Sequence, residues 1–159
     1  MSCAIRPATP ADAPTIHRLI RELAAFERAP DAVENTPENL AWQLAADAPP
    51  FGCLVAERGG GIAGFALYFF NYSTWTGRPG LYVEDLYVTP EARGEGVGKA
   101  LFLALARIAA ERGCGRMEWS VLDWNRTAID FYRSFGARPM DDWTTYRLDA
   151  EALEKIAGR

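Results

Sequence analysis

Residues 81–112, LYVEDLYVTPEARGEGVGKALFLALARIAAER, predict a strand, a glycine-rich turn and a helix in direct succession. The first part is rich in Val, Leu and Tyr, which favour a pleated, half-buried surface. Pro90 ends this strand because proline has no N–H to give to a ladder. After the turn, apolar residues recur at helical spacing, at Val97, Leu101, Leu105 and Ile108. This stripe predicts an amphipathic helix.

The turn itself carries Gly94, Gly96 and Gly98 where the strand feeds the helix. Glycines allow the backbone to approach a ligand closely, and the first N–H groups of a helix have no partner within the helix. Both properties suit a phosphate or pyrophosphate. The even spacing matches neither Gly-x-x-x-x-Gly-Lys-Ser/Thr nor Gly-x-Gly-x-x-Gly. From these residues alone, a glycine-softened connection without any ligand remains the alternative.

The composition predicts one soluble globular domain, residues 1–159, with 49% hydrophobic and 24% charged residues. The net charge of −4 argues against a nucleic-acid partner and favours a cationic small substrate, although mild acidity also simply aids solubility. No apolar run approaches the ~20 residues of a membrane span, and no signal peptide is recognisable at the start. We therefore expect a cytoplasmic protein without a membrane partner.

Cysteine and histidine give no support for metal chemistry. Cys3, Cys53 and Cys114 lack metal-binding or redox spacing, which predicts unpaired thiols in a reducing compartment. The single histidine, His17, falls within a predicted helix and is expected to serve packing or the surface. The prediction is therefore that there is no metal site.

The elements around this stretch follow from capping and periodicity. Before it we expect a strand at 4–6, helices at 10–28 and 36–48, strands at 53–57 and 62–70 joined by a glycine turn, and a loop at 71–80. After it we expect a strand at 117–122, a helix at 125–136, a strand at 143–148 and a helix at 151–156. The order β-α-α-β-β-β-α-β-α-β predicts an α/β fold, a mixed sheet with helices on both faces.

Two motifs together resemble the GNAT acetyltransferase superfamily. The pattern Arg93-x-x-Gly96-x-Gly98 is similar to its acetyl-CoA loop, and Asn125…Phe131-Tyr132…Phe135-Gly136-Ala137 is similar to a helix of that family. Further stretches resemble the spermidine/spermine (diamine) N-acetyltransferase branch: residues 5–9, 19–24 and 83–86, the loop around Trp75 and Gly77, and residues 123–125. The resemblance covers nearly the whole chain and implies a homodimer. Paralogues acting on other amines share these motifs.

The resemblance implies acetyl transfer from acetyl-CoA to a primary amine, without a metal. An aliphatic amine has a pKa near 10.4, so only about one molecule in 10³ is neutral at pH 7, and a base is useful. Glu84 matches the position credited with that role, directly or through water. Tyr132 matches the proposed general acid for the thiolate. From the residues alone, Glu84 is equally a surface charge or a ligand of the amine, and Tyr132 a core tyrosine beside Phe131 and Phe135.

The resemblance also assigns binding residues. Backbone groups that match the pantetheine and thioester segment belong to Leu86, Tyr87 and Val88. The pyrophosphate segment comprises Arg93, Gly94, Glu95, Gly96, Val97, Gly98 and Lys99, and the later cofactor contacts are Asn125, which also has the character of an N-cap, and Ala128. The amine site comprises Phe26, Glu27, Glu84, Glu118, Trp119 and Asp141, with Phe26 where the family more often has Tyr.

The function expected is therefore N-acetylation of a small cationic amine: a polyamine, a diamine or a thialysine-like amino acid. Two other functions fit the same motifs. One is acetylation of a protein or peptide amine, and the other is a non-catalytic acyl-CoA-binding sensor.

Overall fold

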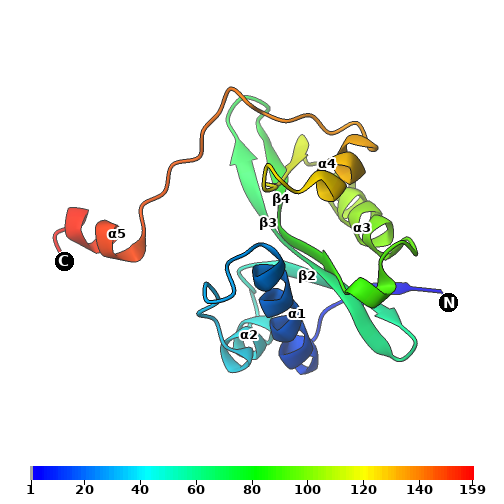
Figure 1. Cartoon of the computed structure of the whole chain (residues 1–159). Coiled ribbons are helices and arrows are strands. Elements are labelled where there is room, and N and C mark those ends of the chain that lie inside the picture. Colours follow the sequence, from blue (N-terminus) through cyan, green and yellow to red (C-terminus); the bar gives the residue numbers. More distant parts are fainter. Residues whose placement is uncertain (1) are drawn as a thin grey trace. The chain divides into compact units, whose positions relative to one another are not determined.

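The computed structural model describes residues 2–159, which form two compact units. The N-terminal unit ends at Ser120 and the C-terminal unit runs from Val121 to Arg159. The N-terminal unit contains, in order, β1 (Ala4–Pro7), the short 3-10 helix η1 (Pro10–Asp12), α1 (Ala13–Phe26), α2 (Pro37–Leu44), β2 (Gly52–Arg58), β3 (Gly61–Ser73), β4 (Arg78–Val88), η2 (Pro90–Ala92), α3 (Val97–Glu111) and β5 (Arg116–Glu118). Figure 1 shows these elements along the chain.

The sheet of the N-terminal unit has the strand order β1-β2-β3-β4-β5. The first four strands pair antiparallel: β2, β3 and β4 form a meander, and β1 is joined to β2 through α1 and α2. Strands β4 and β5 are parallel and are joined through α3. Antiparallel neighbours need only short turns, while a parallel pair needs a crossover of this kind. The predicted mixed sheet is therefore confirmed.

Successive side chains of β2 point to opposite faces of the sheet, as the strand period requires. Leu54 and Ala56 pack in one buried cluster with Leu101 and Leu105 of α3. On the other face, Val55 packs in a second buried cluster with residues of α1 and α2. Helices therefore cover both faces of the sheet, as predicted.

The start of η1 is fixed by an ion pair and a capping box. Asp12 accepts hydrogen bonds from the backbone N–H of Thr9 at 2.8 Å and from the guanidinium of Arg6 at 2.7 Å. The hydrogen bond from Arg6 is the main reason that the pKa of Asp12 falls from 3.8 to about 2. The ionised carboxylate of Asp12 therefore connects η1 to β1 through Arg6.

We expect Asp12→Asn to lower the free energy of unfolding by about 2 kcal/mol at pH 7. The native pKa of Asp12 lies below its unfolded value, so the stabilisation is present above pH 4 and is lost as the pH falls towards 2. Urea unfolding at pH 7 and at pH 3 measures the difference, with Asp31→Asn in an exposed loop as the control. A deficit that is as large at low pH as at pH 7 would contradict the ion-pair origin.

The C-terminal unit contains two helices, α4 (Arg126–Arg133) and α5 (Ala150–Ile156). The strand predicted at 143–148 is wrong, because this segment has no regular structure. Trp143 is 67% exposed and Tyr146 is 91% exposed. A strand needs a ladder partner, and within residues 2–159 no other segment pairs with this one. Its β-favouring residue types alone therefore do not make it a strand.

Several element boundaries differ from the predictions. Residues 71–80 were expected to form a loop, but β3 continues to Ser73 and β4 begins at Arg78, so the connection is a short turn. Residues 71–73 pair with residues 78–80 through the backbone, although the side chain of Tyr72 is exposed. The pattern of hydrophobic residues does not indicate backbone pairing of this kind. Conversely, β5 is shorter than predicted. In the described part of the chain, no helix is long and apolar enough to cross a bilayer.

Candidate active site

A β-bulge places Glu84 at an irregular point of the central strand. Val83 of β4 pairs with Tyr68 of β3, and Asp85 pairs with Leu67, so Glu84 is the extra residue between two consecutive pairs. A bulge re-aims the side chain that it carries and bends the strand. Glu84 is exposed, whereas Val83 before it is buried. The predicted base therefore lies where the strand presents a carboxylate to solvent.

Asp85 is the most perturbed carboxyl group of this region. Its burial raises its pKa from 3.8 to about 6, with smaller contributions from the charges of Glu84 and Glu27. Partial burial also raises the pKa of Glu27, which directly follows α1. Three carboxyl groups from two elements thus share one region. Their mutual repulsion would be relieved by a bound cation.

The ladder between β4 and β5 ends early. Only residues 80–82 of β4 pair with residues 116–118 of β5. Leu86, Tyr87 and Val88 lie beyond this ladder, while their pairing with β3 on the opposite side continues. Their backbone groups on the β5 side are therefore outside any ladder in the described chain, which is the placement that binding of an extended ligand requires.

The glycine loop needs its glycines for backbone conformation. Gly94 has φ 78° and Gly96 has φ 82°, values that side-chain-bearing residues rarely adopt. A Cβ at either position would meet nothing within 4 Å, so space is not the constraint. Gly96 is the N-cap of α3, and the N–H groups of its first turn begin at Val97. Gly98 and Lys99 lie in that same turn.

Two side chains of this loop are tied to other elements. Glu95 forms an ion pair with Arg58 at the end of β2. Arg93 donates from Nε to the carbonyl oxygen of Val88 at 3.0 Å. The pairing of Glu95 neutralises a carboxylate that would otherwise repel an anion on the loop.

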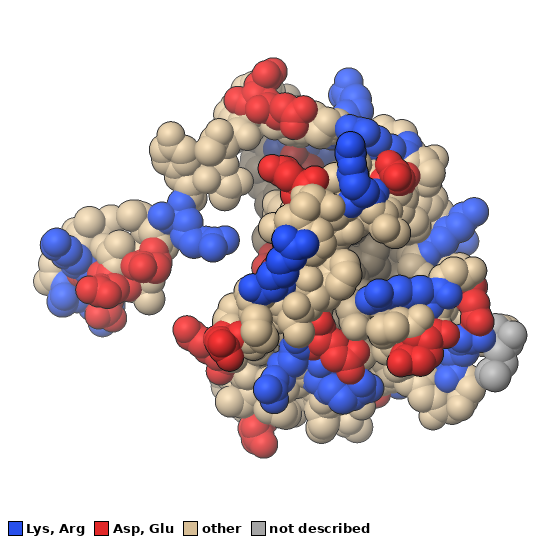
Figure 2. All heavy atoms as spheres, in the orientation of Figure 1, with Lys and Arg blue, Asp and Glu red and all other residues tan. Residues whose placement is uncertain are grey.

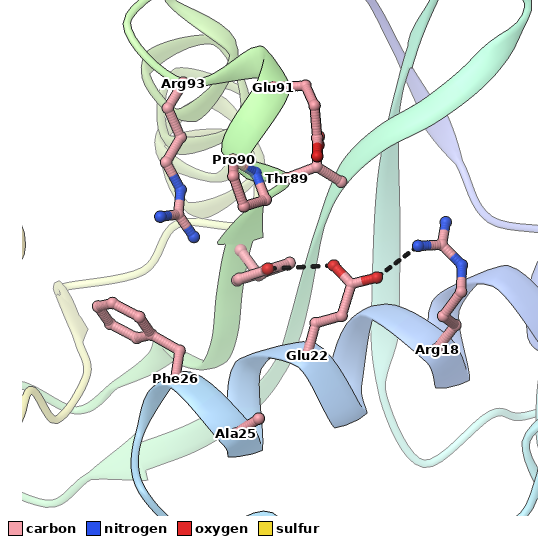
Figure 3. Close-up of a pocket in the computed structure, with 9 residues that line it drawn as sticks. Arg18, Glu22, Ala25, Phe26, Thr89, Pro90, Glu91 and Arg93 are labelled. Carbon is pink, nitrogen blue, oxygen red and sulfur yellow. Dashed lines mark hydrogen bonds and ion pairs between the residues drawn. The ribbon is translucent and has the colours of Figure 1, made fainter.

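A pocket of about 450 Å³ lies between α1 and the end of β4 (Figure 3). Its lining residues are Arg18, Glu22, Ala25, Phe26, Tyr87, Thr89, Pro90, Glu91 and Arg93. Within it, the Tyr87 hydroxyl donates to Glu22 at 3.1 Å, and Glu22 also pairs with Arg18. Phe26, one of the predicted amine-site residues, and Arg93 of the loop line the same pocket.

Two further predicted amine-site residues lie in or beside β5. Glu118 pairs with Arg116 at 2.9 Å. The ring of Trp119 meets Phe102 of α3 edge-on, with centroids 5.4 Å apart, and packs against the buried cluster on that face. The structure thus gives Trp119 a packing role, and its predicted contact with an amine stays a prediction.

The remaining predicted residues belong to the C-terminal unit. Tyr132 lies on α4, with its ring 5.3 Å from that of Phe131, which in turn contacts Phe135. Asn125 accepts a hydrogen bond from the backbone N–H of Ala128 at 3.2 Å, so it is the N-cap of α4. Asp141 is exposed in a turn. The aromatic neighbours keep open the core alternative for Tyr132, and the acid role stays a prediction.

Comparison with known proteins identifies the family. The model of the acetyltransferase (GNAT) family matches residues 16–137, which is well over half of the chain. The chain belongs to the GNAT family. The predicted resemblance and the predicted enzyme class, an N-acetyltransferase, are both confirmed.

Named relatives of this GNAT chain include enzymes acting on amines. It is 40% identical to thialysine N-epsilon-acetyltransferase of Sus scrofa, over 99% of each protein. It is 39% identical to human spermidine/spermine N(1)-acetyltransferase-like protein 1, over 96% of this chain and 23% of that protein. Among solved structures, an integron cassette protein from the mobile metagenome of V. cholerae superposes with a TM-score of 0.81 at 27% identity, covering 100% of this chain and 99% of the other.

Sequence reasoning missed several side chains that shape the site of this GNAT chain. Asp85 stood within a motif, but its burial is a property of the folded sheet. Glu22 and Arg18 share one helix face at i, i+4 spacing, a signal that was available but that does not reveal Tyr87 as a partner. The ion pair of Arg58 with Glu95 could not be predicted from neighbouring residues, because the two partners are distant in sequence.

Charged side chains of both signs are exposed on the surface. On the face shown in Figure 2, Lys and Arg side chains interleave with Asp and Glu side chains. No single sign of charge dominates this face. Among residues 2–159, no group of three or more His, Cys, Asp or Glu side chains has an arrangement that could hold a metal ion.

Proposed function

We propose that this chain is an acetyl-CoA-dependent N-acetyltransferase acting on a primary amine of a small cationic substrate. The observation that carries the proposal is the cluster formed by Glu84 and Asp85, on the strand that leads into the glycine loop, with Glu27, which directly follows α1. Neighbouring carboxyl groups, of which Asp85 and Glu27 have raised pKa values, favour a bound cation, and the glycine loop favours an anion. A cationic amine and a phosphorylated donor meet both requirements.

The donor is held by backbone groups and by the loop. N–H groups at the start of α3 bind the pyrophosphate, with Arg93, Gly94, Glu95, Gly96, Val97, Gly98 and Lys99 forming the segment around it. Backbone groups of Leu86, Tyr87 and Val88 hold the pantetheine arm, supported by the early end of the β4–β5 ladder. Asn125 and Ala128 supply the later contacts. The bound donor supplies an acetyl thioester.

Conversion of the ammonium group into an amide removes two protons from nitrogen and delivers one proton to the leaving sulfur. Glu84, directly or through water, takes a proton from the ammonium group, and the neutral nitrogen then attacks the acetyl carbonyl carbon. The C–N bond forms and the C–S bond breaks, and the nitrogen releases its second proton to water as it becomes the amide. Tyr132 donates its phenolic proton to the leaving thiolate, and a phenol with a pKa of about 10 suits this step.

The carboxyl groups of the candidate site and the relatives support the proposed substrate class. Glu27, Glu84 and Asp85 suit the reacting ammonium group, and Glu118, Trp119 and Asp141 complete the amine site with Phe26. The similarity to thialysine N-epsilon-acetyltransferases over 99% of the chain supports a thialysine-like amino acid or a diamine. Phe26 lacks the hydroxyl of the tyrosine that is common in the family, which argues against a long polyamine.

Turnover across a panel of amines tests this proposal. Free thiol is measured as it is released from acetyl-CoA with thialysine, ornithine, putrescine, spermidine and a lysine-containing peptide. We expect the highest kcat/KM with thialysine or a short diamine. A preference for the peptide would favour the protein-acetylating alternative, and binding of CoA without turnover of any amine would favour the sensor.

Asp85 predicts the pH dependence. Its pKa of about 6 lies above its ordinary value, so the carboxylate that attracts the amine is lost below pH 6. We expect kcat/KM to bend near pH 6, with a steeper fall on the acid side, and we expect Asp85→Asn to remove this bend. Rates from pH 5 to 8 measure it, with Asp47→Asn as the control. A bend retained in Asp85→Asn would contradict the assignment.

We also propose a domain extent and an oligomeric state for this chain. We infer that residues 1–159 act as one acetyltransferase domain, since the family match at 16–137 includes parts of both units. A homodimer is supported by the exposed aromatic side chains of Trp143 and Tyr146. The molar mass in solution, measured by light scattering, tests the dimer. A cytoplasmic location stays a prediction.

A further inference from the structure

The side chain of Arg93 connects the cofactor loop to the end of α1. Its guanidinium carbon lies 5.5 Å from the ring centroid of Phe26 and 5.5 Å from that of Tyr87. Figure 3 shows the guanidinium of Arg93 pointing into the pocket above Phe26. A cation within ~6 Å of a ring centroid is attracted by the ring's quadrupole. Arg93 is thus held by two aromatic rings from two different elements.

Phe26 contacts Arg93 and directly precedes the carboxyl group of Glu27 in the chain. It is the last residue of α1 and is 43% exposed. The next residue, Glu27, carries one of the three clustered carboxyl groups and interacts electrostatically with Asp85. A cation that binds Glu27 and Asp85 would therefore fix the end of α1, and with it the ring beneath Arg93.

The ring of Tyr87 is the second aromatic contact of Arg93, and neighbouring residues hold this ring in place. Its side chain is only 6% exposed, and its hydroxyl donates to Glu22 of α1 at 3.1 Å. Glu22 is also paired with Arg18. This chain of contacts fixes Tyr87 against α1, so the more exposed ring, that of Phe26, is the one whose position a ligand would change.

We propose that Phe26 is a positioning residue that couples amine binding to acetyl-donor binding through its contact with Arg93. This inference rests on the proposed function, because it assigns the two ligands to the two ends of the contact. Amine bound at Glu27 and Asp85 holds the Phe26 ring, the ring holds Arg93, and Arg93 orders the loop whose N–H groups take the pyrophosphate. By linkage, the donor strengthens amine binding by the same factor.

The affinity for CoA provides the test, since it requires no turnover. Titration calorimetry gives the Kd of CoA for the unaltered chain, for Phe26→Leu and for Phe26→Tyr, each with and without saturating thialysine. We expect Phe26→Leu to weaken CoA binding about two- to fivefold and to reduce the effect of thialysine on the CoA Kd. Phe26→Tyr keeps an aromatic ring and should keep both properties.

The chain offers a matched control in Phe70. Its ring lies 5.4 Å from the guanidinium of Arg112 and its side chain is 40% exposed, so Phe70→Leu removes the same kind of contact. We expect Phe70→Leu to lower the melting temperature about as much as Phe26→Leu while leaving the CoA Kd unchanged.

The outcomes separate this inference from the proposed function. If the unaltered chain binds CoA and Phe26→Leu binds it equally well with the same response to thialysine, the coupling is overturned and the proposed function stands. An equal loss of CoA affinity in Phe70→Leu would also overturn the coupling, because it would indicate general destabilisation. Absence of CoA binding by the unaltered chain would overturn the proposed function and, with it, this inference.

Discussion

Replacing Tyr132 with Phe should lower kcat for acetyl transfer about 100-fold while changing the Kd of CoA less than about twofold. The phenol is proposed to protonate the departing thiolate, so its loss is felt in the transition state and hardly in donor binding. Phenylalanine retains the ring that contacts Phe131, so α4 keeps its packing. Steady-state kinetics and calorimetry on the same preparations measure the two quantities.

Phe135→Leu is the matched control for this variant. Phe135 also contacts Phe131, with ring centroids 5.2 Å apart, so it belongs to the same aromatic cluster as Tyr132. We expect this change to lower thermal stability and to leave kcat close to that of the unaltered enzyme. An unaltered kcat in Tyr132→Phe would remove the acid assignment and leave Tyr132 as a packing residue.

Replacing Glu84 with Gln should lower kcat/KM about 100-fold at pH 7. At this pH almost all of the amine is protonated, and the variant lacks the base that removes the proton. The deficit should shrink as the pH rises towards 10, since the free amine no longer needs a base. Glu84 occupies the bulge of β4, and glutamine has nearly the same shape, so the sheet is retained. Initial rates from pH 7 to pH 10 measure the trend, with Glu111→Gln at the end of α3 as the control.

The same measurement separates two roles for Glu84. If the carboxylate only binds the cationic amine, KM rises and kcat at saturating amine stays unchanged. If it accepts the proton, kcat falls at neutral pH. A deficit in kcat that stays constant up to pH 10 would contradict the base assignment, whereas an effect confined to KM would make Glu84 a binding residue.

Most of the N-terminal unit could be predicted because its pattern and its packing agree. Val97, Leu101 and Leu105 form the buried stripe of α3 as their spacing predicted, and Pro90 closes the strand. The alternation in β2 places Leu54 and Val55 in opposite clusters. The spacing of apolar residues along a helix is local in sequence, so periodicity indicates which face of the helix packs against the core.

The errors have a different origin, in contacts that residue type does not encode. Residues 71–73 extend β3 through backbone pairing with residues 78–80, although their side chains do not follow a core pattern. Residues 143–148 have β-favouring side chains but no partner strand within the described chain. Propensity indicates which residues fit a pleated surface, whereas a ladder also requires a partner.

The site shows the same division between local and long-range information. The glycine loop and the bulge carboxylate Glu84 were readable as motifs. The direction of Arg93, towards Phe26 and Tyr87, depends on how α1 packs beside β4. The raised pKa of Asp85 arises from burial, which no motif states. Side chains that are tuned by distant elements therefore emerge only in the folded chain.

Direct product analysis tests the central proposal, that this GNAT chain moves an acetyl group from acetyl-CoA to a small cationic amine. The unaltered enzyme is incubated with acetyl-CoA and thialysine, and mass spectrometry quantifies acetylated amine and free CoA. We predict that acetylated thialysine and CoA accumulate in equal amounts at a rate proportional to enzyme. Release of CoA without acetylated amine, or no reaction with thialysine and putrescine alike, would contradict the proposal.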